Sequence, residues 1–410
     1  MFWESYSHKQ IKEKVFSALD KNLDYREKPV LGLPASYLDP EVFYDDAPFL
    51  KDAPFLSALI ANPNHIGCHT LNDSEVAFEG THQIEKELID ICAKQIFDGR
   101  EEDFDGYVAS GGTEANIQAL WILKGYYETE FQAKADQIGV IYSEDAHYSM
   151  PKASKLLSLK SYVTQVDPIS RAVTKESLEN CINAAQADGV KHFILVINMS
   201  TTMFGSVDDI GKITLWLDDL KVDYKVHVDA AFGGYIYPFS NEASLLTFQN
   251  PKINSFTLDG HKMLQSPYGT GIYLSRKGFM EYGLTEEANY VKGKDYTLVG
   301  SRSGANAIAI WMIMRTYGSE GWKGKIQKLL SKTDRLCSNL DEKGVEYFRN
   351  PFMNIVAIKS EFVSTALADK YMLVPDTHGE GVKWWKIVVM EHVKQGVVDS
   401  FLHDLDMERQ

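Results

Sequence analysis

The chain has few cysteines, no long apolar run and no excess of positive charge. Its four cysteines, Cys68, Cys92, Cys181 and Cys337, are scattered, with no CxxC pair and no metal-ligand spacing. We therefore expect reduced thiols in a cytoplasmic protein, and no metal site. The longest apolar run, HFILVINM, has the length of a strand and not the ~20 residues that span a bilayer. The N-terminal sequence MFWESYSHKQIKEKVF also lacks the cationic start and apolar core of a signal peptide.

The charge balance is acidic, with 42 lysines and arginines against 57 aspartates and glutamates, a net charge of −15. This charge argues against a nucleic-acid or anionic-membrane partner and favours solubility. Hydrophobic residues make up 44% and charged residues 24%, which predicts a large buried core. At about 100–200 residues per domain, a chain of 410 residues suggests two or three lobes.

Strand-like and helix-like segments alternate through the middle of the chain. The predicted strands lie at 140–143, 161–166, 192–198, 225–228 and 255–258, and helices are expected from 151, at 175–187 and at 210–220. This alternation predicts a parallel α/β sheet, which binds its ligands at the carboxyl ends of the strands. Polar residues follow these ends in turn: Ser110, His147, Ser200, Asp229 and Lys262. We therefore expect one functional site at that edge of the sheet.

A glycine turn lies in the segment GYVASGGTEAN at 106–116, which predicts a short strand, a turn and a helix beginning near Thr113. Gly111 and Gly112 allow a close backbone approach, and the free N–H groups of the first helical turn favour a phosphate. A simpler interpretation is a turn capped by Thr113, with Glu114 complementing the helix dipole.

An acid and a lysine, Asp229 and Lys262, follow two of the apolar strands. An acid can keep a pyridine nitrogen protonated, and a lysine can form an imine. An enzyme that uses pyridoxal 5'-phosphate (PLP) requires both of these residues. His147 would stack on the cofactor ring or bind a substrate carboxylate, and Thr201-Thr202 would supply a hydroxyl near it. Taken singly, each has a structural alternative: a surface lysine, a hydrogen-bonding histidine or a turn cap.

The two ends of the chain differ from its middle. An amphipathic helix is expected at 6–22, followed by a proline-punctuated arm at 29–63 in which DAPFL occurs twice. After Gly300, helices at 303–317 and 321–339 precede short strands at 346–348, 354–358 and 383–390 and a helix at 396–405. We predict three parts: an N-terminal helix and arm (1–60) that packs on a partner subunit, a large domain (61–299) and a small α+β domain (300–410).

Six motifs in order, YVASGGTEAN, SEDAHYSMPKA, NMSTTMFGSVDD, HVDAAFGG, DGHKM and GSRSG, resemble the series found in group II PLP-dependent amino-acid decarboxylases. The resemblance covers roughly 60–400. NIVAI and KIVVMEHV are similar to the tyrosine/aspartate decarboxylase branch, while SEDAHYSMPKASKLLSLKS and NYVKGKDYTLVGSRSG are similar to bacterial PLP-dependent histidine decarboxylase.

The resemblance implies a type I aminotransferase fold, a homodimer with active sites at the interface, and loss of the substrate α-carboxylate as CO₂. It assigns roles by position: Lys262 to the imine, Asp229 to the ring nitrogen, His147 and Ala231 to the ring faces, Gly111, Gly112, Thr113 and His261 to the phosphate side, Thr202 to the ring oxygen, and Ser301 to a phosphate contact from the partner subunit. A loop tyrosine, Tyr290 in preference to Tyr296, would reprotonate the substrate. Ser200 departs from the family pattern, which usually has Gly-Thr-Thr here.

Alternatives remain open at this stage. An aminotransferase or carbon–carbon lyase on the same fold would need an arginine fork, for which Arg349 is the best-placed candidate. A non-catalytic homologue is a further alternative. The substrate is also open: aromatic residues of the arm, including Phe49, Phe55 and Phe78, suit an aromatic side chain, whereas Asn64, His65 and His69 suit a polar or acidic one.

Overall fold

The computed structural model describes residues 2–22, 46–66, 76–99, 104–284, 295–376 and 381–409. Its centre is a seven-stranded sheet with the strand order β2-β8-β7-β6-β5-β3-β4. The strands are β2 (Phe104–Ala109), β3 (Ile138–Ser143), β4 (Lys160–Thr164), β5 (His192–Asn198), β6 (Asp223–Asp229), β7 (Ile253–Asp259) and β8 (Gly271–Arg276). Only β8 among these strands runs antiparallel to its neighbours. The predicted mostly parallel sheet is therefore confirmed.

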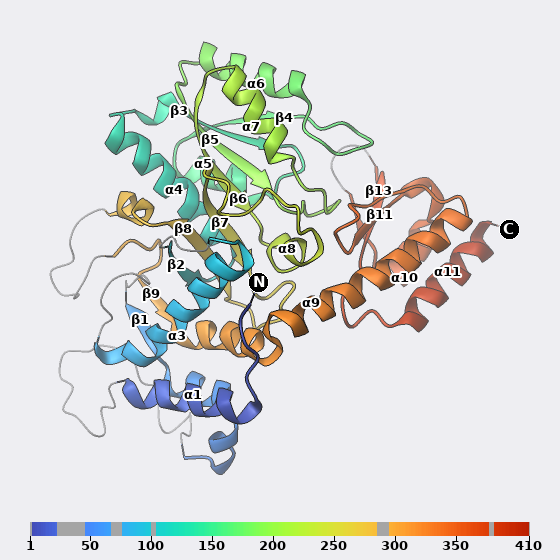
Figure 1. Cartoon of the computed structure of the whole chain (residues 1–410). Helices are drawn as coiled ribbons and strands as arrows, with labels where there is room; N and C mark the ends of the chain where they lie inside the picture. The colour runs from blue at the N-terminus through green and yellow to red at the C-terminus, as the bar shows by residue number, and fades with distance from the viewer. Residues whose placement is uncertain are drawn as a thin grey trace.

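Helices cover both faces of this sheet (Figure 1). They are α3 (Glu79–Asp90), which continues as a π-helical turn at Ile91–Ile96, α4 (Gly112–Glu130), α5 (Ser149–Leu156), α6 (Lys175–Ala187), α7 (Ile210–Asp219) and the short α8 (Tyr237–Ser240). Consecutive strand residues enter different cores: Leu195 and Ile197 join one buried cluster, and Ile194 and Val196 the other. Because side chains alternate along a strand, a strand buried on both faces reads as an unbroken apolar run.

The N-terminal helix predicted at 6–22 is α1 (His8–Lys21), which begins at a capping box made by Ser7 and Gln10. Its buried face (Ile11, Val15 and Ala18) packs on α3 of the same chain. The two DAPFL copies form a 3₁₀ turn (Pro48–Asp52) and α2 (Pro54–Ala61). Each copy has one exposed residue in its Phe-Leu pair: Phe49 is 62% exposed in the first copy and Leu56 is 45% exposed in the second.

A long helix, α9 (Gly304–Glu342), runs from the large sheet to a small one (Figure 1). Gly318 interrupts it with φ 61°, and a Cβ there would lie 2.8 Å from the Ser5 nitrogen. The two helices predicted on either side of this break are therefore confirmed.

The small sheet has the antiparallel order β10-β11-β13-β12 and its own buried cluster. Its elements are β10 (Tyr347–Phe348), β11 (Ile355–Lys359), β12 (Val374–Pro375) and β13 (Trp384–Val388), with α10 (Thr365–Lys370) and α11 (Gln395–Arg409) beside them. A further two-stranded pairing joins β1 (Asn64–Ile66) to β9 (Ser301–Ser303). The division of the chain at residues 60 and 299 stays a prediction. Of the helices in the described segments, none has the length and hydropathy to cross a membrane.

The first testable prediction concerns the packing of α3. Leu88 is fully buried in the main cluster, so Leu88→Ala should lower the free energy of unfolding by about 2–5 kcal/mol, measured by urea denaturation. Leu215→Ala is the matched control, because Leu215 is 58% exposed on α7 and should change stability by less than about 0.5 kcal/mol. Equal losses in the two variants would contradict this packing.

Candidate active site

The predicted polar residues meet at the carboxyl edge of the large sheet. Ser110 follows β2, Ser200 follows β5, Asp229 ends β6 and Lys262 follows β7. Neighbouring parallel strands are in register there, with Asn198 opposite Asp229 and Asp229 opposite Thr257. The edge is thus a shared surface for groups that lie far apart in the sequence.

The Asp229 carboxylate is buried and held at both oxygens. Oδ1 accepts a hydrogen bond from the Ala231 backbone N–H at 3.0 Å, and Oδ2 accepts one from Asn116 Nδ2 at 2.9 Å. Each oxygen keeps a free lone pair, so the carboxylate has a fixed orientation and can still accept a further donor. Asn116 belongs to the GGTEAN motif, but the sequence analysis did not single it out.

The amine of Lys262 lies 3.0 Å from Asp259 Oδ2, and the Lys262 side chain is one-third exposed. Asp259 is buried, and its burial raises the pKa of its carboxyl, an effect that the Lys262 charge opposes. The other oxygen, Oδ1, has no hydrogen-bond partner in the described part of the chain, and neither has the buried Nδ1 of His261. Asp259 stands in the DGHKM motif, but no sequence pattern distinguished it as a site residue.

The ring of His147 is half-buried and belongs to the same part of the site. Its Nδ1 lies 2.8 Å from Ser149 Oγ. Burial lowers the pKa of His147, the Asp229 carboxylate acts in the opposite direction, and the Lys262 amine lowers it further. Contacts through Ser149 and Asn116 connect this ring to the Asp229 carboxylate.

The glycine turn packs directly on this group of residues. A Cβ at Gly112 would lie 2.7 Å from Asp259 Oδ2 and 3.2 Å from the Ala231 side chain. At Gly111 a Cβ would meet His261 at 3.7 Å. Helix α4 begins at Gly112 without a side-chain cap, so Thr113 is not the cap that the simpler interpretation required. No side chain in the described part of the chain caps its first N–H groups, which suits an anion.

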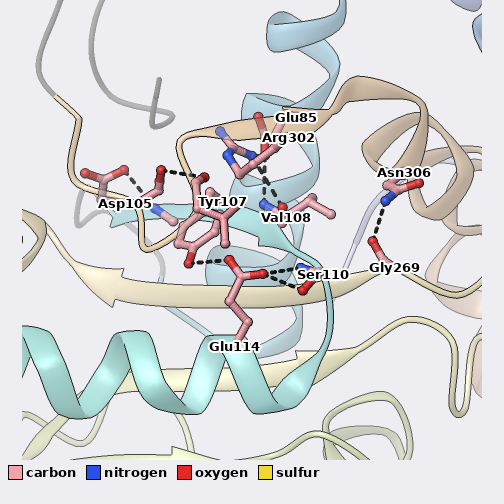
Figure 2. Close-up of polar contacts among 12 residues, drawn as sticks. Glu85, Asp105, Tyr107, Val108, Ser110, Glu114, Gly269, Arg302 and Asn306 are labelled. Atoms are coloured by element: carbon pink, nitrogen blue, oxygen red, sulfur yellow. Dashed lines mark hydrogen bonds and ion pairs between the residues drawn. The ribbon is translucent and has the colours of Figure 1, made fainter. Parts of the chain in front are cut away.

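Buried polar contacts brace the turn from behind, as Figure 2 shows. Glu114 Oε2 accepts hydrogen bonds from the backbone N–H and the hydroxyl of Ser110, at 2.8 and 2.6 Å, while Oε1 accepts one from the Tyr107 hydroxyl. Arg302, on β9, forms a buried ion pair with Glu85 of α3 at 2.5 Å, and Glu85 also accepts from the Val108 N–H of β2. The turn is thereby fixed to α3, β2 and β9.

For the remaining predicted residues, the structure gives burial or exposure, or the residues lie outside its described part. Ala231 is buried beside Asp229, while the side chains of Thr202 and Ser301 are exposed. Tyr296 is 4% exposed within the second buried cluster, and its carbonyl accepts from Gln118 Nε2. Tyr290 and His69 lie outside the described residues, as do the side chains of Asn64 and His65. The cofactor and catalytic roles of these residues stay predictions.

Two features of the 200–206 turn bear on the site: the backbone of Ser200, where the sequence departs from the family's usual glycine, and a contact from Lys386 that was not foreseen. Ser200 has φ 94°, in the left-handed region that favours glycine, and its buried hydroxyl has no partner among the described residues. Lys386, from β13 of the small domain, donates to the Thr202 carbonyl at 3.1 Å. Burial lowers the pKa of the Lys386 amine, and the charge of Lys262 lowers it further, so a second amine lies near the site.

The arginine fork of an aminotransferase is not available in the described residues after Gly300. Arg349, the best-placed candidate, pairs with Asp334 at 2.6 Å and donates to the Met353 carbonyl. The other arginines with described side chains in this region pair with carboxylates as well: Arg302 with Glu85, Arg315 with Glu87 and Arg335 with Asp399. This pairing disfavours transamination.

The geometry therefore defines a fold-type I site with an acid, a lysine, a histidine and an anion-binding turn. The model of the pyridoxal-dependent decarboxylase conserved domain matches residues 82–357, and the chain belongs to this family. The resemblance to group II PLP-dependent decarboxylases is confirmed.

Individual relatives agree with this family. The chain is 46% identical to tryptophan decarboxylase from Clostridium sporogenes, over 98% of this chain and 97% of the relative. It is 29% identical to histidine decarboxylase from Vibrio campbellii, over 77% of this chain and 78% of the relative. L-methionine decarboxylase from Streptomyces sp. 590 shares the fold with a TM-score of 0.67, at 19% identity, over 84% of this chain and 86% of that structure.

The chain is thus a PLP-dependent amino-acid decarboxylase. The residues present fit the cofactor. Asp229 offers an oriented carboxylate, Lys262 a primary amine, and the start of α4 an uncapped set of N–H groups beside the unpartnered His261 Nδ1. Such unpartnered buried atoms are expected where a ligand completes the hydrogen bonding.

The second testable prediction concerns His227, which is buried behind the site. Burial lowers the pKa of His227 to about 4, below its ordinary value of 6.5. As the pH falls, this histidine is therefore protonated in the unfolded chain before it is protonated in the folded protein. The free energy of unfolding that neutral His227 contributes is lost as the pH falls from about 6.5 to about 4. The variant His227→Gln lacks this titration. The free energy of unfolding of the wild type minus that of the variant should therefore fall by roughly 3 kcal/mol across that pH range.

Urea denaturation of both proteins at a series of pH values measures the difference. Burial also raises the pKa of Asp208 to about 6, which acts in the opposite direction over the same range. Because Asp208 is present in both proteins, its effect cancels in the comparison. Parallel stability profiles for the two proteins would contradict the assignment of a neutral, buried histidine.

Proposed function

We propose that the enzyme decarboxylates L-tryptophan to tryptamine and CO₂. The observation that carries this proposal is the 46% identity to a tryptophan decarboxylase along 98% of the chain, against 29% to a histidine decarboxylase along 77%. Bound PLP supplies an electron-accepting ring that stabilises the negative charge left at Cα when CO₂ departs. The protein has to place the substrate carboxylate, keep that ring protonated and return a proton.

The proposed roles follow the sequence prediction. Lys262 holds the cofactor and releases the product, and Asp229 accepts a hydrogen bond from the ring nitrogen and keeps it protonated. The contacts assigned around the cofactor are Gly111, Gly112, Thr113 and His261 on the phosphate side, His147 and Ala231 on the ring faces, Thr202 at the ring oxygen and Ser301 from the partner subunit. Tyr290 returns the proton to Cα.

Two exposed tyrosines support an aromatic substrate. Tyr148 is 63% exposed and its ring centre lies 4.1 Å from that of His147. Tyr268 is 86% exposed and lies 5.0 Å from the His261 ring. Each places an aromatic face beside a histidine of the site, where an indole ring has stacking partners.

We further propose a cytoplasmic homodimer with its active sites at the subunit interface. Large apolar side chains of the N-terminal region are exposed: Phe49 at 62%, Leu56 at 45%, Leu59 at 40% and Val76 at 61%. A second copy of the chain would cover such a surface. The free thiols of Cys92, Cys181 and Cys337 suit the reducing cytoplasm.

The role of Lys262 is tested by Lys262→Ala. Without this amine the protein should lose the visible absorbance of attached cofactor, and CO₂ release should fall to background. Lys191→Ala, which removes an exposed lysine remote from the site, should leave both unchanged. Wild-type turnover by Lys262→Ala would rule out the assignment.

Substrate choice is tested by supplying the purified enzyme separately with tryptophan, tyrosine, phenylalanine, histidine and aspartate. CO₂ and amine are measured together, so that transamination, which yields a keto acid, is distinguished. Tryptophan should have the highest kcat/KM, by at least about tenfold over histidine and aspartate, which corresponds to about 1.4 kcal/mol of transition-state stabilisation. A preference for histidine or aspartate would overturn the substrate proposal.

A further inference from the structure

Asn116 lies at the centre of a buried hydrogen-bond network that joins the acid and the histidine of the site. Its side chain, on α4, is 1% exposed. Nδ2 lies 2.9 Å from Asp229 Oδ2 and 3.0 Å from Ser149 Oγ, while Oδ1 lies 2.9 Å from His227 Nε2. All three polar positions of the amide (two N–H groups and the carbonyl oxygen) therefore have a partner.

The direction of each hydrogen bond follows from groups that can play only one role. An Asp229 carboxylate only accepts, so the Asn116 amide must turn its NH₂ group towards it. The Asn116 oxygen then faces His227, whose Nε2 must carry a hydrogen and donate. His227 Nδ1 is left as the acceptor for the Ser255 hydroxyl at 2.8 Å. The Asp229 carboxylate thus fixes which way the Asn116 amide points, and the amide in turn fixes the tautomer of His227.

The same reasoning fixes the proton of His147. The backbone N–H of Ser149 can only donate, and it lies 3.3 Å from His147 Nδ1. The Ser149 hydroxyl accepts from Asn116 and lies 2.8 Å from the same nitrogen, to which it donates. With Nδ1 an acceptor, the hydrogen of the neutral imidazole is on Nε2.

We propose that Asn116 is a positioning residue, which orients the Asp229 carboxylate directly and, through Ser149, holds His147 with its hydrogen on Nε2 as a hydrogen-bond donor to the substrate. This inference rests on the decarboxylation proposed above. It gives His147 a defined role: the ring donates a hydrogen bond and does not accept a proton. The proton that Cα receives then comes from another group, such as Tyr290.

Two variants separate the branches of the network. Ser149→Ala removes the hydroxyl between Asn116 and His147 but leaves the bond from Asn116 to Asp229. It should lower kcat about tenfold and leave the affinity of the apoenzyme for PLP unchanged. Asn116→Leu removes both branches, so it should also weaken PLP binding, by about tenfold, measured by titration of the apoenzyme.

A matched control lies on the same helix as Ser149. Ser154 of α5 is 2% exposed, and its hydroxyl donates to the Met150 carbonyl, away from the network. Ser154→Ala should keep wild-type kcat and PLP affinity. If Ser149→Ala and Ser154→Ala behave alike, or if Asn116→Leu binds PLP as the wild type does, the positioning role is wrong. His227→Gln retains a donor towards Asn116 and should recover most of the PLP affinity that His227→Leu loses.

The proton position is tested without turnover. In the ¹⁵N spectrum of histidine-labelled protein, the His147 signals, assigned by their loss in His147→Gln, should show a protonated Nε2 and an unprotonated Nδ1. His147→Gln, which places an N–H near the position of Nε2, should keep more activity than His147→Asn, which places one near Nδ1. A protonated Nδ1 would overturn the inference, whereas failure of tryptophan as substrate would leave the spectrum and the PLP affinities unaffected.

Discussion

The site depends on a carboxylate that is buried at the end of a strand. Asp229 is 7% exposed, and a buried charge is costly unless hydrogen bonds and an opposite charge compensate it. Two hydrogen bonds from the protein, from Asn116 and from the Ala231 backbone, fix its plane and leave room for a third donor. A protonated cofactor nitrogen would be such a donor, which is the role proposed for Asp229.

The surrounding elements keep this arrangement rigid. Strand register sets Asp229 beside Asn198 and Thr257, and the glycine turn approaches so closely that a Cβ at Gly112 would clash with Asp259. Behind the turn, the Glu85–Arg302 ion pair and the contacts of Glu114 join α3, β2, α4 and β9. The small sheet contacts the 200–206 turn at the same edge: Lys386 donates to the Thr202 carbonyl, and the rings of Phe348 and Trp384 pack against Phe204. Both sheets therefore support this turn.

Much of this could be predicted from the sequence, because strands, helices and glycine turns are local patterns. The alternating elements gave the parallel sheet, and the strand ends located Asp229, Lys262 and His147. The network behind them could not be predicted in this way. Asn116 and His227 are 111 residues apart, and only the folded sheet brings them together. Lys386 was missed for the same reason, because it contacts Thr202 from 184 residues away. Asp259 is only three residues from Lys262, but its burial and its contact with the lysine amine have no periodic signature in the sequence.

The proposed chemistry depends on Lys262 as the residue that holds the cofactor. Reduction of the PLP-loaded enzyme with borohydride, followed by proteolysis and mass spectrometry, tests this claim most directly, because it attaches the cofactor permanently to the lysine that carries it. We expect the pyridoxyl group on the peptide that contains Lys262. Its presence on Lys386, the second amine near the site, or on another lysine would show that Lys262 does not hold the cofactor.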